Sequence, residues 1–182
     1  MEGSAVEFYS EMIIPFSGLK PGKYQFDFDV EGSFFENFEY SEIMQASVKV
    51  ACSLDRQPRM LIFDFAIDGK VTLPCDRCLE ECEVAVSGKE RYIVKFGAQR
   101  FEESEEILVI TEQEHEVDLR QVIFEYIHLA LPLKRIHGED DMGQSFCNPE
   151  MIKFITDAPE FIREDPRWET LKKLKDSETK KE

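Results

Sequence analysis

Two cysteines separated by two residues are the sharpest chemical feature of this 182-residue chain. They lie in Pro74-Cys75-Asp76-Arg77-Cys78-Leu79-Glu80, where a turn can direct both thiolates at one metal ion. Zinc needs four ligands, and the candidates for the other two are Cys147, His137 and Cys82. Cys82 falls on the apolar face of an alternating segment, which favours a place in the core. The candidate zinc site is therefore Cys75, Cys78, Cys147 and His137.

Two other interpretations of the cysteine pair stay open. A nearby positive charge such as Arg77 lowers a thiol pKa and favours redox chemistry, although redox pairs usually belong to a thioredoxin-like pattern. The two residues can also be partly buried thiols in a hairpin with no cofactor. Glycine-rich phosphate loops, nucleophile elbows and zinc-protease helices are absent from the sequence, so we expect no enzymatic activity.

A second candidate site consists of basic residues in the middle of the chain. Arg56, Arg59, Arg77 and Arg91 lie on or near predicted strands, and aromatic residues are interleaved with them. Arginine and aromatic side chains on one sheet face can contact phosphates and bases. An ordinary solvated sheet face is the alternative.

The net charge of −16 comes mainly from two parts of the chain. Residues 1–43 carry −7 and residues 101–150 carry −10, whereas residues 44–100 carry +1 and residues 151–182 are neutral. Such a chain is not an ordinary nucleic-acid binder, because those have an excess of Lys and Arg. Acidic segments can instead hold a basic protein, and a local arginine face can still touch RNA.

Alternating apolar residues predict the strands that must position these side chains. Residues 24–30, 46–54, 61–67, 71–73, 82–86 and 91–96 alternate with period two. Asp68-Gly69 predicts a tight turn between two of these strands, and Gly88 predicts another. Short connections favour an antiparallel meander. Residues 101–106 read as a charged loop, followed by a short strand over 107–110.

Apolar residues at helical spacing predict one main helix from Asp118 to Leu131. Asp118 is its candidate N-cap, with Gln121 at the capping-box position. A short amphipathic helix is predicted after Asp165-Pro166. We therefore expect an α+β fold: a twisted antiparallel meander packed by one main helix, with a short C-terminal helix. Residues 1–160 form one domain in this interpretation, and residues 161–182 form the terminal helix and a disordered tail.

The sequence also bears on the compartment. It has no apolar run long enough to span a membrane, and its start has neither a basic region nor an apolar stretch typical of a signal peptide. An odd count of five cysteines suits a reducing compartment, because at least one stays unpaired. We therefore expect a cytoplasmic protein with no membrane partner.

Several short motifs in a fixed order resemble the YceD family, known as the large ribosomal RNA subunit accumulation protein. They are the Pro74–Glu80 element, Val117-Asp118-Leu119, the helix end Glu125-Tyr126-Ile127-His128-Leu129-Ala130-Leu131-Pro132, then His137, Cys147, and Asp165-Pro166-Arg167-Trp168. The resemblance spans residues 20–175. Many members carry a second CxxC near the downstream cysteine, which would complete a four-thiolate site, whereas this chain has only Cys147 there.

The resemblance implies a role in ribosome biogenesis, namely the accumulation or processing of large-subunit ribosomal RNA. The implied partners are that RNA or its precursor particle, and a basic large-subunit ribosomal protein. We expect a non-catalytic factor without a required cofactor. The alternative is a zinc-binding or thiol-redox protein centred on Cys75 and Cys78.

Overall fold

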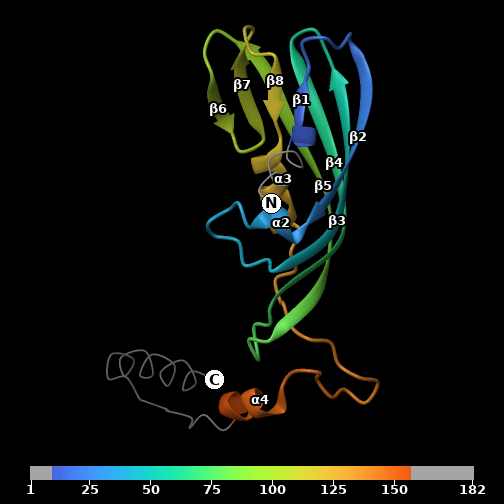
Figure 1. Ribbon diagram of the computed structural model, residues 1–182, viewed down its shortest axis with the longest axis vertical. Helices are drawn as coiled ribbons and strands as arrows, with labels where there is room; N and C mark the ends of the chain where they lie inside the picture. The colour runs from blue at the N-terminus through green and yellow to red at the C-terminus, as the bar shows by residue number, and fades with distance from the viewer. Residues whose placement is uncertain (1–9, 157–182) are drawn as a thin grey trace, which may run out of the picture. The chain divides into compact units, whose positions relative to one another are not determined.

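The computed structural model describes residues 10–156, and its main element is a six-stranded sheet (Figure 1). The strand order in this sheet is β2-β3-β4-β5-β7-β6. These strands are β2 (Gly22–Glu31), β3 (Gln45–Arg56), β4 (Met60–Pro74), β5 (Glu81–Gly97), β6 (Phe101–Ser104) and β7 (Ile107–Thr111). A two-stranded sheet pairs β1 (Ile13–Pro15) with β8 (Glu116–Asp118). The helices are η1 (Ser10–Met12), α2 (Gly32–Phe35), α3 (Arg120–Leu129) and α4 (Pro149–Thr156).

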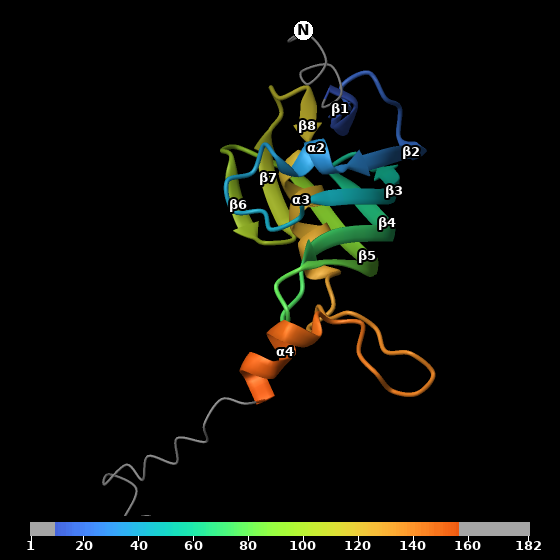
Figure 2. The ribbon, with the colours of Figure 1, turned by 60° about the horizontal axis from the view of Figure 1, so that its bottom comes forward.

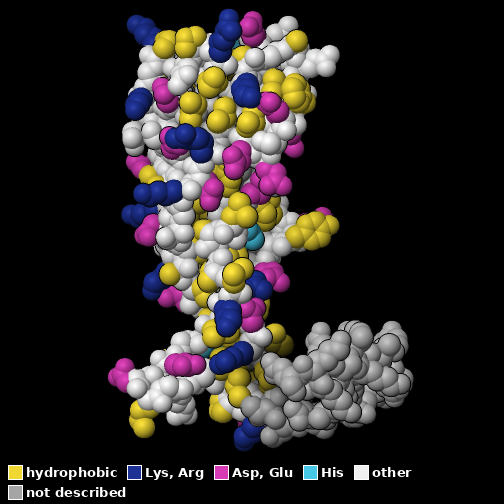
Figure 3. Space-filling model, turned by 180° about the vertical axis from the view of Figure 1, so that it is seen from behind, with side chains coloured by type: hydrophobic (Ala, Val, Ile, Leu, Met, Phe, Trp, Pro, Cys, Tyr) yellow, Lys and Arg dark blue, Asp and Glu magenta, His cyan; other side chains and the backbone are white. Residues whose placement is uncertain are grey.

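The predicted α+β fold and the antiparallel meander of its central strands are confirmed, since β2, β3, β4 and β5 pair in sequence order. Burial alternates along these strands as the sequence predicts, with one face packed in the core and the other open to solvent. Figure 3 shows the open face, where acidic and basic side chains mingle with apolar ones.

The two glycine turns predicted inside the meander are wrong, because β4 and β5 run through Gly69 and Gly88 as long continuous strands. A Cβ at Gly69 would lie 2.4 Å from the carbonyl oxygen of Ser47 on β3. A Cβ at Gly88 would lie 3.4 Å from Cβ of Ala130, just after α3. Gly69 therefore marks close packing within the sheet, and Gly88 lies at an ordinary contact distance from the residue after α3. Neither glycine is a chain reversal.

The far edge of the sheet also differs from the prediction. The charged segment expected as a loop contains β6, and β7 lies between β5 and β6. β7 pairs antiparallel with β6 but parallel with β5, so the sheet is mixed rather than wholly antiparallel. Pairing with β5 begins where the amide of Ile93 donates to the carbonyl of Glu106, at 2.8 Å.

Helix α3 covers the packed face of the sheet, as predicted, and Figure 2 shows it lying across the strands. Its buried residues are Val122, Ile123, Tyr126 and Ile127. The predicted N-cap is wrong by one residue: the cap is Leu119, and Asp118 instead accepts a hydrogen bond from the amide of Arg120 at 3.0 Å. Gln121 donates forward to Glu125 rather than back to the cap, so there is no capping box.

The chain divides into two compact units, Met1–Asn148 and Pro149–Glu182. Within the second unit the described part is α4, an eight-residue helix that begins at a proline. The predicted domain boundary at residue 160 and the predicted helix after Asp165 lie outside the described residues. None of the helices in residues 10–156 has the length and apolar character needed to cross a membrane.

Candidate metal centre

Cys75 and Cys78 lie in a tight turn directly after β4, which ends at Pro74. The amide of Cys75 donates to the carbonyl of Glu80 at 2.8 Å, and the amide of Leu79 donates to the carbonyl of Cys75 at 3.0 Å. Leu79 has a φ of 62°, a left-handed conformation that is uncommon for a residue with a Cβ. The reversal brings both thiols of the pair to the same side of the turn.

The loop after α3 supplies the other two candidate ligands. Asp76 and Arg135 tie this loop to the cysteine turn from both sides: the amide of Asp76 donates to the carbonyl of Arg135 at 2.7 Å, and the amide of Arg135 donates to the Asp76 carboxylate at 2.8 Å. The Arg135 guanidinium also contacts Asp76, at 3.1 Å, and Glu42, at 2.6 Å. These contacts hold the loop where His137 and Cys147 reach the pair.

One side-chain atom from each of Cys75, Cys78, His137 and Cys147 lies within 4.8 Å of the other three. The sulfurs of Cys75 and Cys147 are 3.8 Å apart, and Nδ1 of His137 is 3.4 Å from the Cys78 sulfur and 3.7 Å from the Cys147 sulfur. Tetrahedral zinc, with bonds of about 2.3 Å to sulfur and about 2.0 Å to nitrogen, separates its ligand atoms by about 3.5 to 3.8 Å. The three distances between these atoms match that spacing.

The imidazole of His137 is oriented by a backbone partner. Its Nε2 lies 2.9 Å from the carbonyl oxygen of Glu81. A carbonyl only accepts, so in the neutral ring Nε2 carries the hydrogen and Nδ1 presents its lone pair to the three sulfurs. A ligand histidine held by a carbonyl through its other nitrogen is the usual arrangement in protein metal sites.

The environment of the cluster favours thiolate at one of its cysteines. Burial opposes ionisation of Cys75, but hydrogen bonds from the backbone amides of Cys78, Arg77 and His137 outweigh it and lower the pKa of this thiol to about 6. Burial raises the pKa of Cys78. A hydrogen bond with Cys147 is the main cause of the raised pKa of His137. Thiolate is the form that binds metals and also the form that attacks disulfides.

Cys82 lies in the core, as predicted, and does not belong to the four-residue cluster. The arrangement can do two things chemically: hold a tetrahedral cation through three sulfurs and one nitrogen, or form a disulfide between neighbouring thiols. All five cysteines are free thiols in this structure.

The four arginines named as candidate RNA or partner contacts do not form one patch. Arg59 precedes β4 and Arg77 follows it, so a strand of on the order of 45 Å separates them. Arg56 donates through Nε to the carbonyl of Phe16 at 3.2 Å. Arg91 is paired with Asp64 on the neighbouring strand at 2.6 Å. The strand register therefore does not gather these four arginines on one face of the sheet.

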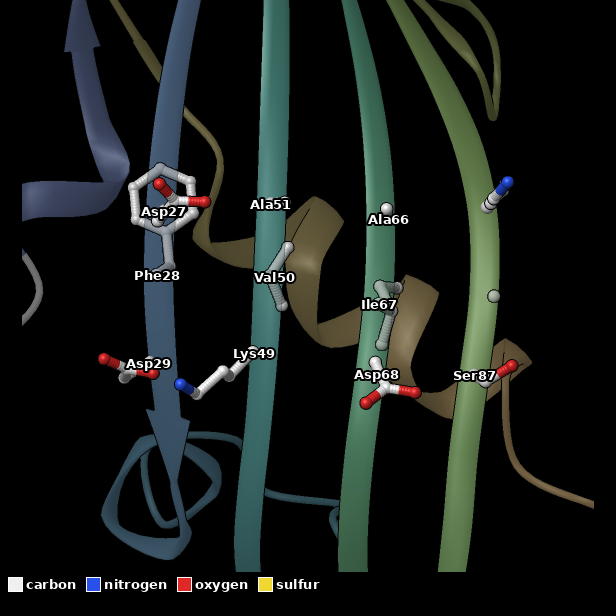
Figure 4. Close-up of a pocket in the computed structure, with 12 residues that line it drawn as sticks. Asp27, Phe28, Asp29, Lys49, Val50, Ala51, Ala66, Ile67, Asp68 and Ser87 are labelled. Atoms are coloured by element: carbon white, nitrogen blue, oxygen red, sulfur yellow. The ribbon is translucent and has the colours of Figure 1, made fainter.

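The open sheet face instead has a shallow trough of about 770 Å³ with mixed charge. Figure 4 shows its carboxylates and ammonium groups on adjacent strands, with Asp29 and Lys49 side by side and Asp68 beyond them. Small residues such as Ala51 and Ala66 form its floor. Alternating charges of this kind are typical of a solvated sheet surface.

The sequence interpretation missed the residues that support the cluster. Asp76 and Arg135 are 59 positions apart, and no local pattern links them. Glu81 contributes only its backbone carbonyl, so its side-chain type carries no signal. The left-handed conformation of Leu79 could not be predicted either, because glycine is the residue that usually adopts it.

The fold and the cluster define a small α+β protein in which three thiols and an imidazole converge at one end of a long twisted sheet. A family model described as "Large ribosomal RNA subunit accumulation protein YceD" matches residues 63–175. This is more than half of the chain and includes all four cluster residues, and the chain belongs to that family. No curated protein matches the chain, and neither does any solved structure.

Proposed function

We propose that this protein is a non-catalytic ribosome-biogenesis factor that promotes accumulation or processing of large-subunit ribosomal RNA. Family membership carries this proposal, because the family is described by that role. In this proposal the protein acts in the cytoplasm, and it binds the RNA, its precursor particle or a basic large-subunit ribosomal protein. The acidic 101–150 segment and the scattered arginines favour a basic protein as the direct contact.

Affinity purification of the tagged full-length chain from cell extract tests this function. We expect large-subunit ribosomal proteins or precursor particles to be recovered, and depletion of the protein to lower the amount of large-subunit RNA relative to small-subunit RNA. Recovery of neither ribosomal proteins nor precursor particles, with unchanged RNA levels, would refute the proposal.

A second function is zinc binding by Cys75, Cys78, His137 and Cys147. The observation that favours it is the spacing of the four ligand atoms together with the orientation of His137 by Glu81. A closed set of four protein ligands suits a structural zinc ion, which leaves no open position for a substrate. In this role the metal joins the cysteine turn to the loop after α3 and stabilises that end of the sheet.

Elemental analysis of the purified protein tests zinc binding directly. We expect about one zinc per chain, and loss of the metal in Cys78→Ser and His137→Ala. Cys52→Ala serves as the control, because Cys52 is buried in β3 and is not part of the cluster. Cobalt substitution provides an independent readout, since thiolate ligation gives intense visible absorption.

The redox alternative predicts a different result in the same samples. It requires metal-free protein in which Cys75 forms a reversible disulfide with Cys78 or Cys147, detected by mass shift after thiol alkylation. Zinc-free protein with such a disulfide would contradict the zinc assignment and favour redox chemistry.

A further inference from the structure

A second cavity, far from the cysteine cluster along the chain, lies between helix α3 and the β5–β7–β6 edge of the sheet. Its volume is about 320 Å³. Its floor consists of buried side chains, namely Tyr92, Leu108 and Val122. Exposed polar side chains from β6, its following turn and α3 form the rim. The cavity therefore has a largely apolar floor and a charged, solvent-exposed opening.

The rim is strongly acidic. Glu102, Glu105, Asp118 and Glu125 line the cavity, and Arg100 is the one cation among its lining residues. The Arg100 guanidinium is already bound to the carboxylate of Glu114, and Asp118 is held by Arg120. Glu102 and Glu105 have no ion pair or hydrogen bond among the described residues, so their negative charge is free to attract a ligand.

Tyr92 supplies an independent sign of a missing polar partner. The residue is 8% exposed, and its hydroxyl makes no hydrogen bond within residues 10–156. It lines this cavity, and its oxygen keeps some access to solvent, so the hydroxyl opens on the cavity. A hydroxyl on a ring this deeply buried normally has a hydrogen-bond partner, from the protein, from water or from a ligand. By contrast, Tyr126 on α3 satisfies its hydroxyl by donating to the carbonyl of Arg91 at 3.0 Å.

The strand register explains why Glu102 faces this cavity while its neighbour does not. Glu102 pairs with Leu108, a buried floor residue, and so points to the packed side of the sheet. Glu103 points to the opposite side, where it binds Lys95 at 2.7 Å. The inward carboxylate is thus part of the cavity wall, and Glu103 gives a matched control with the same charge and the same strand.

We propose that this cavity receives a lysine side chain from a basic protein partner. The ammonium group would donate to the free carboxylates Glu102 and Glu105 and to the oxygen of Tyr92, while the aliphatic part of the lysine covers Leu108 and Val122. Phosphates of RNA are repelled by the same rim, so this site selects protein over RNA. The proposal rests on the proposed function, because it identifies the basic partner's contact.

Binding of defined peptides to the full-length protein tests the site. The probe is a short lysine-glycine peptide, its Nε-acetylated counterpart is the negative probe, and spermidine and magnesium chloride are the competing cations. Amide NMR shifts of labelled protein locate the binding, and calorimetry measures it. We expect saturable shifts at β6, β7 and the first turn of α3 with the lysine peptide, and none with the acetylated one.

Three variants decide the role of the named residues. The double variant Glu102→Gln/Glu105→Gln should weaken peptide binding by about tenfold or more, because charge-assisted hydrogen bonds are lost. Tyr92→Phe should weaken it by about fivefold, because it removes one acceptor for the ammonium group. Glu103→Gln should leave it unchanged within about twofold, since long-range charge effects are screened in physiological salt.

Four outcomes would overturn the inference. One is equal weakening by Glu103→Gln, which would mean diffuse charge attraction. Another is magnesium producing the same shifts while the peptide does not, which would mean a divalent cation site. The third is spermidine binding as tightly as the peptide, which would mean a polyamine site. If the double variant still recovers ribosomal proteins from extract as well as the wild type, the cavity inference fails while the proposed function stands.

Discussion

Single side chains that connect helix α3 to the sheet contribute to the stability of the fold. The hydroxyl of Tyr126 crosses from α3 to the backbone of β5, and the ring is 5% exposed. Such a bond contributes about 1 kcal/mol, because a buried carbonyl would otherwise lose its partner. The same burial, aided by nearby glutamates, raises the pKa of the Tyr126 hydroxyl above its ordinary value.

Tyr126→Phe should therefore lower the free energy of unfolding by about 1 kcal/mol at pH 7. The folded-state pKa lies above the unfolded one, so the stability from neutral Tyr126 is complete below pH of about 10 and is lost as pH rises above that value. The variant should lose less stability than the wild type between pH 9 and about 11. Urea unfolding at each pH measures both effects.

Tyr40→Phe is the matched control, because Tyr40 is 88% exposed and carries the same chemical change. It should differ from the wild type by less than about 0.5 kcal/mol. A Tyr126→Phe protein as stable as this control, with an unchanged alkaline profile, would contradict the role of the helix-to-sheet bond.

At the scale of elements, the length of β4 and β5 decides where the cysteine turn lies. β4 has 15 residues and β5 has 17, and neither is interrupted by its central glycine. The uninterrupted hairpin carries the turn after Pro74 well beyond the part of the sheet that α3 covers (Figure 1). Two shorter hairpins, as the glycine pattern predicted, would not have placed the cysteines there.

Gly69→Ala should destabilise the protein by about 1 to 3 kcal/mol, because the added methyl group overlaps the backbone of β3. The nearest atoms would be the Ser47 carbonyl oxygen at 2.4 Å and the Val48 Cα at 2.6 Å. Gly88→Ala should change stability by less than about 1 kcal/mol, since its nearest neighbour is at an ordinary contact distance. Thermal and urea unfolding of the two variants compare them directly.

Equal stability of the two alanine variants would show that β3 and β4 do not approach closely at Gly69. A strongly destabilised Gly88→Ala would instead indicate that α3 packs tightly on β5 at that point. Either result would alter the account of why these strands continue through glycine.

For the whole molecule, the distribution of charge decides which partners can bind without specific recognition. The net charge is −16, and the four candidate arginines are spread along the sheet rather than gathered. RNA binding by electrostatics alone requires a basic surface that releases counterions from phosphates. The rim of the cavity beside α3 is acidic instead.

Purified protein should therefore not shift a single-stranded RNA of arbitrary sequence in a gel at micromolar protein and about 0.15 M salt. A basic protein of similar size should be bound under the same conditions, and binding should weaken as salt rises. Tight binding of arbitrary RNA would contradict the assignment of a basic protein as the direct contact.

The sequence by itself determined the alternating strands, the main helix, the thiol-rich candidate site and the acidic segments. These features are local or additive: periodicity, short spacing and charge can be counted along the chain. The family resemblance was also available from motifs in order, and the family match confirms it.

Only the tertiary structure decided which residues meet. The approach of His137 and Cys147 to the cysteine turn depends on Asp76 and Arg135, which no local pattern connects. Gly69 and Gly88 were predicted to be turns, because the residues that they contact in β3 and just after α3 are distant in the sequence. The direction of Glu102 depends on the register of β6 with β7. Contacts between segments that are distant in the sequence leave no periodic pattern in it. They are determined by packing and by strand register, which only the tertiary structure shows.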